Sequence, residues 1–173
     1  MAGVRQRIIN YAWRMPLTDR EAVIKFVEHT YFGSVQRQDI AAVMDCFTAT
    51  ATVIIRHGDN PVRQFSKVKQ AGTDNLQDFY AHLCGNYAAW FGDFQHYIDG
   101  GAQRSACYFT VQLTPKPDGL YAAAGRQTLQ NCNFFDYDGD RIRRMIIYYS
   151  NTGSVDGTPT GYPQQASPSR EGV

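Results

Sequence analysis

The chain has 173 residues, of which 43% are hydrophobic and 13% aromatic, and its 17 basic and 16 acidic residues give a formal net charge of +1. This length predicts a single domain with a substantial core. The balanced, interspersed charge excludes the basic surface that nucleic-acid-binding proteins need, and no apolar run approaches the roughly 20 residues of a membrane-spanning helix. We therefore expect a globular cytoplasmic protein without nucleic-acid or membrane partners.

Cysteine and histidine spacing gives no sign of a metal site. The four cysteines, Cys46, Cys84, Cys107 and Cys132, lie far apart and form no C-x-x-C motif, so we expect buried free thiols in a reducing compartment. No pair of histidines or carboxylates has ligand spacing, and the chain lacks glycine-rich nucleotide loops. The sequence predicts no metal and no cofactor.

Helical patterns dominate the first half of the chain. Residues 1–17 form an N-terminal extension that could hold a short helix. Thr18 is followed three residues later by Glu21, the spacing of a capping box. Asp39 and Thr73 also stand where helix caps are expected. The predicted helices run from Thr18 to about Ser34, from Asp39 through Phe47, and from Thr73 to about Trp90.

The second half reads as strands separated by turns rich in Asp and Gly, at residues 99–101, 117–119 and 138–139. Such turns join sequential antiparallel strands into a meander. Residues 153–173 are rich in glycine and proline and are predicted to lack regular structure. The predicted strands are Thr50–Arg56, a short one near Val62–Phe65, Phe91–Ile98, Arg104–Thr114, Tyr121–Phe135 and Arg141–Tyr149.

Alternation within 104–114 separates two faces of a strand. Cys107, Phe109 and Val111 share one face, whereas Tyr108 lies on the other. A strand of this kind suits a sheet with a core side and a pocket side, and it suits equally a sheet with a solvent side.

Three motifs resemble the nuclear-transport-factor-2-like superfamily over about residues 18–152. They are Gly72-x-x-x-Leu76-x-x-Phe79-Tyr80, Phe47-x-x-x-Ala51-Thr52-Val53 and Asp138-Gly139-Asp140-x-Ile142-x-Arg144. Within that superfamily the chain is similar to the SnoaL-like branch of polyketide cyclases, ketosteroid isomerases and scytalone dehydratases. The resemblance implies an α+β domain in which a strongly curved, cone-shaped antiparallel sheet holds three helices on its concave face. It also implies a small apolar ligand in the cone and a homodimer formed through the outer sheet face.

The resemblance singles out His96, because the string Gln95-His96-Tyr97-Ile98-Asp99-Gly100-Gly101 is similar to the dehydratase version. Imidazole is a natural general base for removing a proton next to a carbonyl group. The aspartate that completes the family's dyad is replaced here by Gln36, which cannot stabilise an imidazolium as a carboxylate does. Either His96 works with a different acid, or the chain binds a ligand without turning it over, and His96 then has a structural role in the sheet.

Other candidates come from the same comparison. Tyr31 matches the tyrosine of the isomerase oxyanion hole, but Ile55 stands at the position of the isomerase base. Gln130 matches a pocket amide of the dehydratase and shares a face with Phe134. If that face is concave, Gln130 and Tyr108 become polar groups in an apolar pocket. The candidate site consists of catalytic His96 and Tyr31, with Tyr108, Gln130, Gln36, Ile55 and Phe134 as substrate-binding residues.

Two functions fit these patterns. The first is a cofactor-free lyase or isomerase that removes a proton from a small polyketide- or steroid-like carbonyl compound. The second is a non-catalytic ligand-binding module or structural subunit, similar to the β subunit of ring-hydroxylating dioxygenases. Missing carboxylates favour the second function, and the motif around His96 favours the first.

Overall fold

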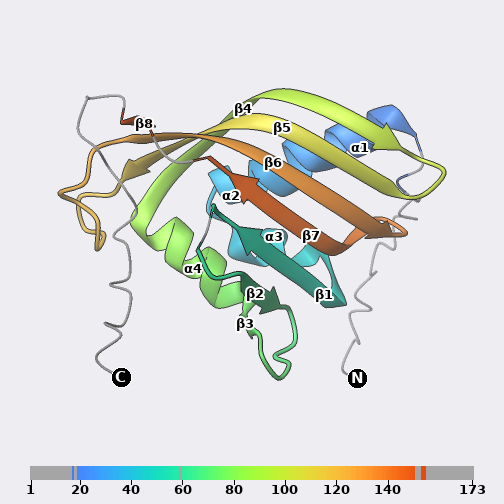
Figure 1. Cartoon of the computed structure of the whole chain (residues 1–173), viewed down its shortest axis with the longest axis horizontal. Helices are drawn as coiled ribbons and strands as arrows, with labels where there is room; N and C mark the ends of the chain where they lie inside the picture. Colours follow the sequence, from blue (N-terminus) through green and yellow to red (C-terminus); the bar gives the residue numbers. More distant parts are fainter. Residues whose placement is uncertain (1–16, 18, 59, 151–152, 155–173) are drawn as a thin grey trace, which may run out of the picture.

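The computed structural model describes residues 17, 19–58 and 60–150, with the backbone of 153–154. The predicted N-terminal extension, apart from Leu17, and most of the predicted C-terminal tail lie outside these residues. A long curved sheet arches over the helices (Figure 1), so that the helices cover one face of the sheet and leave the other uncovered. The elements are α1 (Arg20–Lys25), η1 (Phe26–Phe32), α2 (Gly33–Gln36), α3 (Ile40–Asp45), α4 (Leu76–Asn86), β1 (Phe47–Arg56), β2 (Arg63–Ser66), β3 (Asp74–Asn75), β4 (Tyr87–Asp99), β5 (Arg104–Pro115), β6 (Gln127–Asp138), β7 (Arg141–Tyr149) and β8 (Gly153–Ser154).

The first helix is continuous through α1, η1 and α2. Its N-cap is Asp19, whose carboxylate accepts a hydrogen bond from the Ala22 amide at 2.8 Å. The predicted capping box placed this role on Thr18, one residue too early. Both residue types cap helices well, so the sequence alone does not separate two such neighbours.

The central part of this helix is a π-helix, which the sequence analysis did not predict. Its buried side chains are Phe26, Val27, Tyr31 and Phe32. These residues form two pairs five positions apart, and a π-helix, whose hydrogen bonds span five residues, brings such pairs onto one face. The wider turn therefore turns both Tyr31 and Phe32 toward the sheet.

Helix α3 has the predicted cap, since the Asp39 side chain accepts from the Ala42 amide at 3.0 Å. Helix α4 begins later and ends earlier than predicted. Its cap is Asn75, which accepts from the amides of Gln77 and Asp78. Thr73, the predicted cap, instead forms a 2.6 Å hydrogen bond with the hydroxyl of Ser66.

The sheet is mixed, which corrects the prediction of a purely antiparallel one. Strands β4, β5, β6 and β7 form the predicted antiparallel meander. Strand β1 pairs in parallel with β7 and antiparallel with β2, giving the order β3-β2-β1-β7-β6-β5-β4. Strand β1 follows helices α1 to α3 in the chain and pairs with β7, the last strand of the meander.

Strand boundaries differ from prediction mainly next to helices and turns. Residues 87–90 belong to β4 rather than to the preceding helix, and residues 121–126 form turns before β6 begins at Gln127. Strand β4 carries a bulge between Gly92 and Gln95, where Asp93 has a φ of 56°, and bulges bend strands. In the predicted irregular tail, Gly153 and Ser154 form a short strand, β8, on β6.

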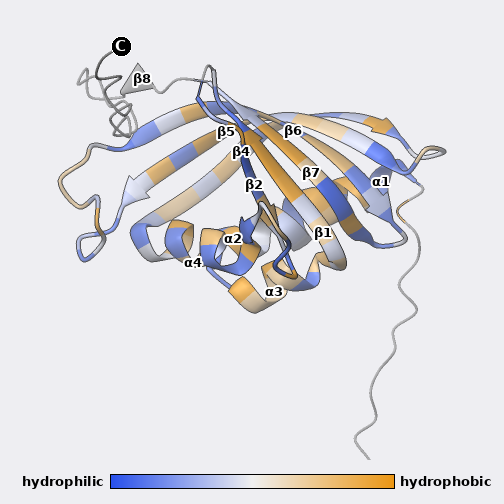
Figure 2. Cartoon of the chain, turned by 60° about the horizontal axis from the view of Figure 1, so that its bottom comes forward, coloured by the Kyte–Doolittle hydropathy of each residue, from blue (hydrophilic) through white to orange (hydrophobic). Residues whose placement is uncertain are grey.

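The core lies between the concave face of the sheet and the helices. Figure 2 shows hydrophobic residues along the underside of the strands that faces the helices. Phe47, Phe109 and Phe135 are completely or almost completely buried there. Cys46, Cys84 and Cys107 are buried as predicted, Cys132 is half-buried, and none of these four cysteines forms a disulfide bond. The predicted α+β cone with helices on its concave face is confirmed.

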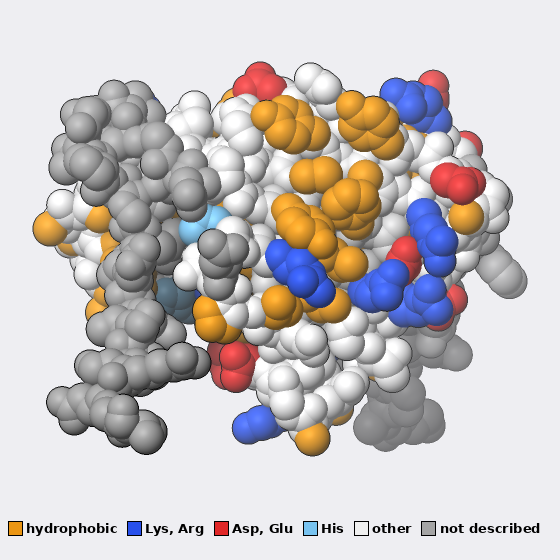
Figure 3. All heavy atoms as spheres, viewed as in Figure 1, with side chains coloured by type: hydrophobic (Ala, Val, Ile, Leu, Met, Phe, Trp, Pro, Cys, Tyr) orange, Lys and Arg blue, Asp and Glu red, His pale blue; other side chains and the backbone are white. Residues whose placement is uncertain are grey.

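The outer face of the sheet exposes a group of aromatic rings. Phe134 and Tyr148 stand in T-shaped contact, with ring centroids 5.9 Å apart, and Tyr97 and Tyr108 are also exposed. Figure 3 shows hydrophobic side chains gathered on this face beside several basic ones. Here Asp136 pairs with Arg144 at 2.8 Å. Homodimerisation through this face stays a prediction.

Candidate ligand-binding site

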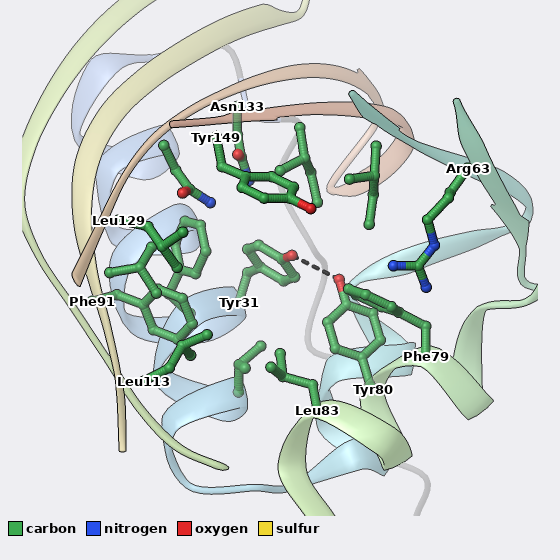
Figure 4. A pocket seen from close by; sticks show the side chains of 16 residues that line it. Tyr31, Arg63, Phe79, Tyr80, Leu83, Phe91, Leu113, Leu129, Asn133 and Tyr149 are labelled. Atoms are coloured by element: carbon green, nitrogen blue, oxygen red, sulfur yellow. Dashed lines mark hydrogen bonds between the residues drawn. The ribbon is translucent and has the colours of Figure 1, made fainter. Parts of the chain in front are cut away.

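A mainly apolar cavity of about 100 Å³ opens between the concave face of the sheet and helices η1, α2 and α4 (Figure 4). Most of its wall is aliphatic or aromatic, as in sites for small organic molecules. A few polar side chains interrupt that wall. The lining residues are Tyr31, Phe32, Val35, Ile55, Arg63, Phe79, Tyr80, Leu83, Phe91, Val111, Leu113, Leu129, Asn131, Asn133, Ile147 and Tyr149.

Two phenols form a hydrogen-bonded pair in this wall. The hydroxyl oxygens of Tyr31, from η1, and Tyr80, from α4, lie 2.7 Å apart, and Figure 4 shows them pointing toward each other. Phe47 packs against both rings and holds them in place. One hydroxyl hydrogen joins the two oxygens, so the pair keeps a second hydrogen that it can donate to a ligand.

Burial keeps both phenols in the neutral form that donates hydrogen bonds. Tyr31 and Tyr80 are 2% and 1% exposed. Burial raises the pKa of Tyr31, and the hydrogen bond from Tyr80 opposes that rise only in part. Burial, together with the nearby Tyr31, raises the pKa of Tyr80 well above its usual value. Neither phenol ionises in the physiological pH range.

Strand β6 contributes two amides to the same cavity. Asn131 and Asn133 lie between Leu129 and Phe135 in the row of β6 side chains that points to the concave face. Asn133 is 1% exposed, and the Oδ1 atoms of both asparagines are buried without a hydrogen-bond partner. The Asn133 amide group has one weak contact, from Nδ2 to the sulfur of Met145 at 3.6 Å.

Charge is found at one side of the cavity. The guanidinium of Arg63 turns toward the space between Tyr80 and Tyr149 (Figure 4) and lies 5.1 Å from the ring of Phe65. Burial raises the pKa of Tyr149, and the positive charge of Arg63 acts against that rise. His57 stacks on the ring of Tyr149, with ring centroids 4.2 Å apart.

His96 lies outside this cavity. Its Nε2 is 2.8 Å from Oε1 of Glu28, and its side chain is only 5% exposed. Phe94 stacks on the imidazole and also packs against Phe32, which lines the cavity. His96 thus has the acidic partner that Gln36 does not provide, but aromatic rings separate the imidazole from the cavity.

The other predicted site residues fall in three places. Tyr31 and Ile55 line the cavity, as the resemblance implied. Gln36 is exposed and borders a separate surface hollow beside Glu28. Tyr108, Gln130 and Phe134 lie on the outer face of the sheet, where Gln130 donates to Thr110 at 3.2 Å.

The predicted placement of Gln130 and Phe134 in the pocket was therefore wrong, and their neighbours Asn131 and Asn133 line the cavity instead. Both faces of β6 contain polar residues, so alternation alone gives no clear choice. A better signal was that Leu129 and Phe135, which share a face with Asn131 and Asn133, are large and apolar. This face therefore had to be the buried one, like the face of β5 that carries Phe109 and Val111.

Among the described residues, no cluster of three or more histidine, cysteine, aspartate or glutamate side chains could hold a metal ion. Within the same part of the chain, no helix is long and apolar enough to cross a membrane. The cavity wall, as far as the structure describes it, contains neither histidine nor carboxylate.

The raised pKa values of Tyr31 and Tyr80 predict sensitivity to alkali. Above about pH 10 the tyrosines of the unfolded chain lose their protons while these buried phenols keep theirs, so the free energy of unfolding should fall as the pH rises. Urea unfolding measured between pH 8 and 11 tests this. The double variant Tyr31→Phe/Tyr80→Phe should show a shallower fall, and an equally steep one would contradict the assignment.

Solved structures share this fold. A Methylobium petroleophilum PM1 protein of unknown function with a cystatin-like fold is 16% identical, with a TM-score of 0.57 over 86% of this chain and 84% of that chain. A putative polyketide cyclase from Pseudomonas putida KT2440 is 19% identical, with a TM-score of 0.57 over 78% and 92%. A Mycobacterium tuberculosis LEH-like epoxide hydrolase is 15% identical, with a TM-score of 0.55 over 75% and 83%.

No family model matches the chain, and no curated protein sequence matches it. The structural similarity confirms the predicted fold, a curved sheet packed over helices, which is also found in putative polyketide cyclases. At these identities the similarity establishes the fold alone, because one fold hosts many functions.

Proposed function

We propose that the cavity binds a small, largely apolar carbonyl compound and that the Tyr31–Tyr80 pair donates a hydrogen bond to the carbonyl oxygen. The observation that carries this proposal is a neutral phenol pair with one hydrogen to donate, placed in an otherwise apolar wall. A carbonyl oxygen accepts such a bond, and the hydrocarbon part of the ligand gains from leaving water.

The same arrangement suits a cofactor-free lyase or isomerase. When a proton is removed next to a carbonyl group, negative charge develops on the oxygen, and fixed donors in a dry site stabilise that charge. Tyr31 and Tyr80 would supply these donors. The predicted general base is His96, held by Glu28, and it must reach the substrate through a movement of the Phe32 and Phe94 side chains.

A non-catalytic binding module is the second candidate. The observation that favours it is the lack of a histidine or carboxylate among the described lining residues. A bound carbonyl compound would then be held and polarised, with no group in contact to remove its proton.

Acetophenone and ethylbenzene form a matched pair of probes, because they have similar size and only the first carries a carbonyl oxygen. Calorimetric titration should show that wild-type protein binds acetophenone more tightly. In Tyr31→Phe/Tyr80→Phe the affinity for acetophenone should fall about tenfold, as expected for one buried hydrogen bond. The affinity for ethylbenzene should stay unchanged. Equal loss for both probes, or no binding of either, would overturn the proposal.

Hydrogen exchange separates the two candidate functions. A lyase or isomerase of this type should accelerate deuterium incorporation into the acetophenone methyl group in D₂O, measured by NMR. Tyr31→Phe/Tyr80→Phe should slow that exchange. Tight binding without accelerated exchange would instead support the binding module.

A further inference from the structure

The strongest unexplained feature of the cavity is the pair of unpartnered amide oxygens on β6. Buried polar atoms nearly always have a hydrogen-bond partner, and one without a partner costs about 1–3 kcal/mol. Here two such oxygens, Oδ1 of Asn131 and Oδ1 of Asn133, lie in one cavity wall.

The neighbours of these two amides do not explain them as residues that stabilise the fold. Both residues lie on β6 between β5 and β7, where Asn133 stands opposite Cys107 on one side and Ile147 on the other. Neither neighbour offers a strong donor to an amide oxygen. An aliphatic side chain would fill the same positions without leaving polar atoms unpaired, so the amides are explained by what enters the cavity.

Both oxygens expose almost no surface in the structure, so a group in the cavity reaches them when the amide groups of these lining residues turn toward it. A ligand without a hydroxyl or amine hydrogen leaves the oxygens unpaired, whereas a ligand with one supplies the missing hydrogen bond. The wall therefore discriminates between ligands that differ by a single donor.

We infer that the natural ligand carries a hydroxyl group in addition to its carbonyl, and that Asn133, assisted by Asn131, accepts the hydrogen bond from that hydroxyl. This inference rests on the proposed function, since it takes the phenol pair as the site of the carbonyl oxygen. The two polar sets are then complementary: Tyr31 and Tyr80 donate, whereas Asn131 and Asn133 accept. The ligand class is a small hydroxylated ketone or aldehyde.

The test compares acetophenone with its 2′-, 3′- and 4′-hydroxy isomers by calorimetric titration of the full chain. At least one isomer should bind wild-type protein about tenfold more tightly than acetophenone does. In Asn133→Leu that advantage, measured as the ratio of the two affinities in the same variant, should disappear. Asn131→Leu should reduce the advantage in part. Melting temperatures establish that each variant is folded.

The outcomes separate the two proposals. If acetophenone binds but no isomer binds more tightly, the inference about the hydroxyl is wrong and the proposed function stands. The inference is equally wrong if an isomer keeps its advantage in Asn133→Leu. If neither acetophenone nor any isomer binds, the proposed function itself fails. Where a variant does not fold, the wild-type comparison still tests whether the ligand carries a hydroxyl group.

Discussion

Val111→Phe should abolish saturable binding of acetophenone. Val111 is 3% exposed, lines the cavity and lies opposite Leu129 in the sheet register. A phenyl ring at this position occupies space that the ligand needs. A ligand that buries about 100 Å² less apolar surface loses about 2.5 kcal/mol, close to a hundredfold in affinity.

The matched control is Val68→Phe, which makes the same substitution at a residue that is 61% exposed. This variant should bind acetophenone as wild-type protein does. Unfolding measurements belong beside the titration, because overpacking a filled core costs about 1–3 kcal/mol, whereas filling a cavity costs less. Unchanged binding in a folded Val111→Phe variant would show that the ligand lies elsewhere.

His96→Ala should destabilise the fold while leaving acetophenone affinity within about twofold. The change removes a hydrogen bond to a carboxylate, worth about 1.5–3 kcal/mol, and the stacking contact with Phe94. This bond ties edge strand β4 to the first helix. Urea unfolding measures the destabilisation, and the acetophenone titration measures the affinity.

Glu28→Gln is the control for this prediction, because glutamine keeps an oxygen that can accept from His96. It should cost less than half as much stability as His96→Ala. Unchanged stability in His96→Ala would contradict this prediction. Complete loss of methyl-proton exchange in the folded variant would support the proposed role of His96 as general base and would require the Phe32 and Phe94 barrier to open during turnover. Exchange at the wild-type rate would contradict that role.

The sequence predicted the architecture well where local chemistry is decisive. Turns rich in Asp and Gly defined the meander, and Asp39 capped its helix as predicted. Prediction failed where two neighbouring residues are equally good helix caps, as with Thr18 and Asp19 at the start of α1. It also missed the parallel pairing of β1 with β7, because a contact between strands so far apart leaves no mark in local periodicity.

The site was harder to predict than the fold. Tyr31 and Ile55 reach the cavity, but Tyr80 was noted only as part of a family motif, and its hydrogen bond with Tyr31 spans 49 residues. The face of β6 depends on register, and a shift of one residue exchanges Gln130 for Asn131. Glu28, the acid beside His96, was missed because the expected partner was taken from the family's position, Gln36, which lies further along the same helix.

The most direct test of the central claim is a crystal structure of the protein soaked with acetophenone. We predict that the ring packs against Val111 and Leu129, with the carbonyl oxygen within about 2.5–3.0 Å of the Tyr31 or Tyr80 hydroxyl, the range of an O–H···O hydrogen bond. A ligand bound only on the outer sheet face, or one inside the cavity whose oxygen points away from both phenols, would contradict the claim.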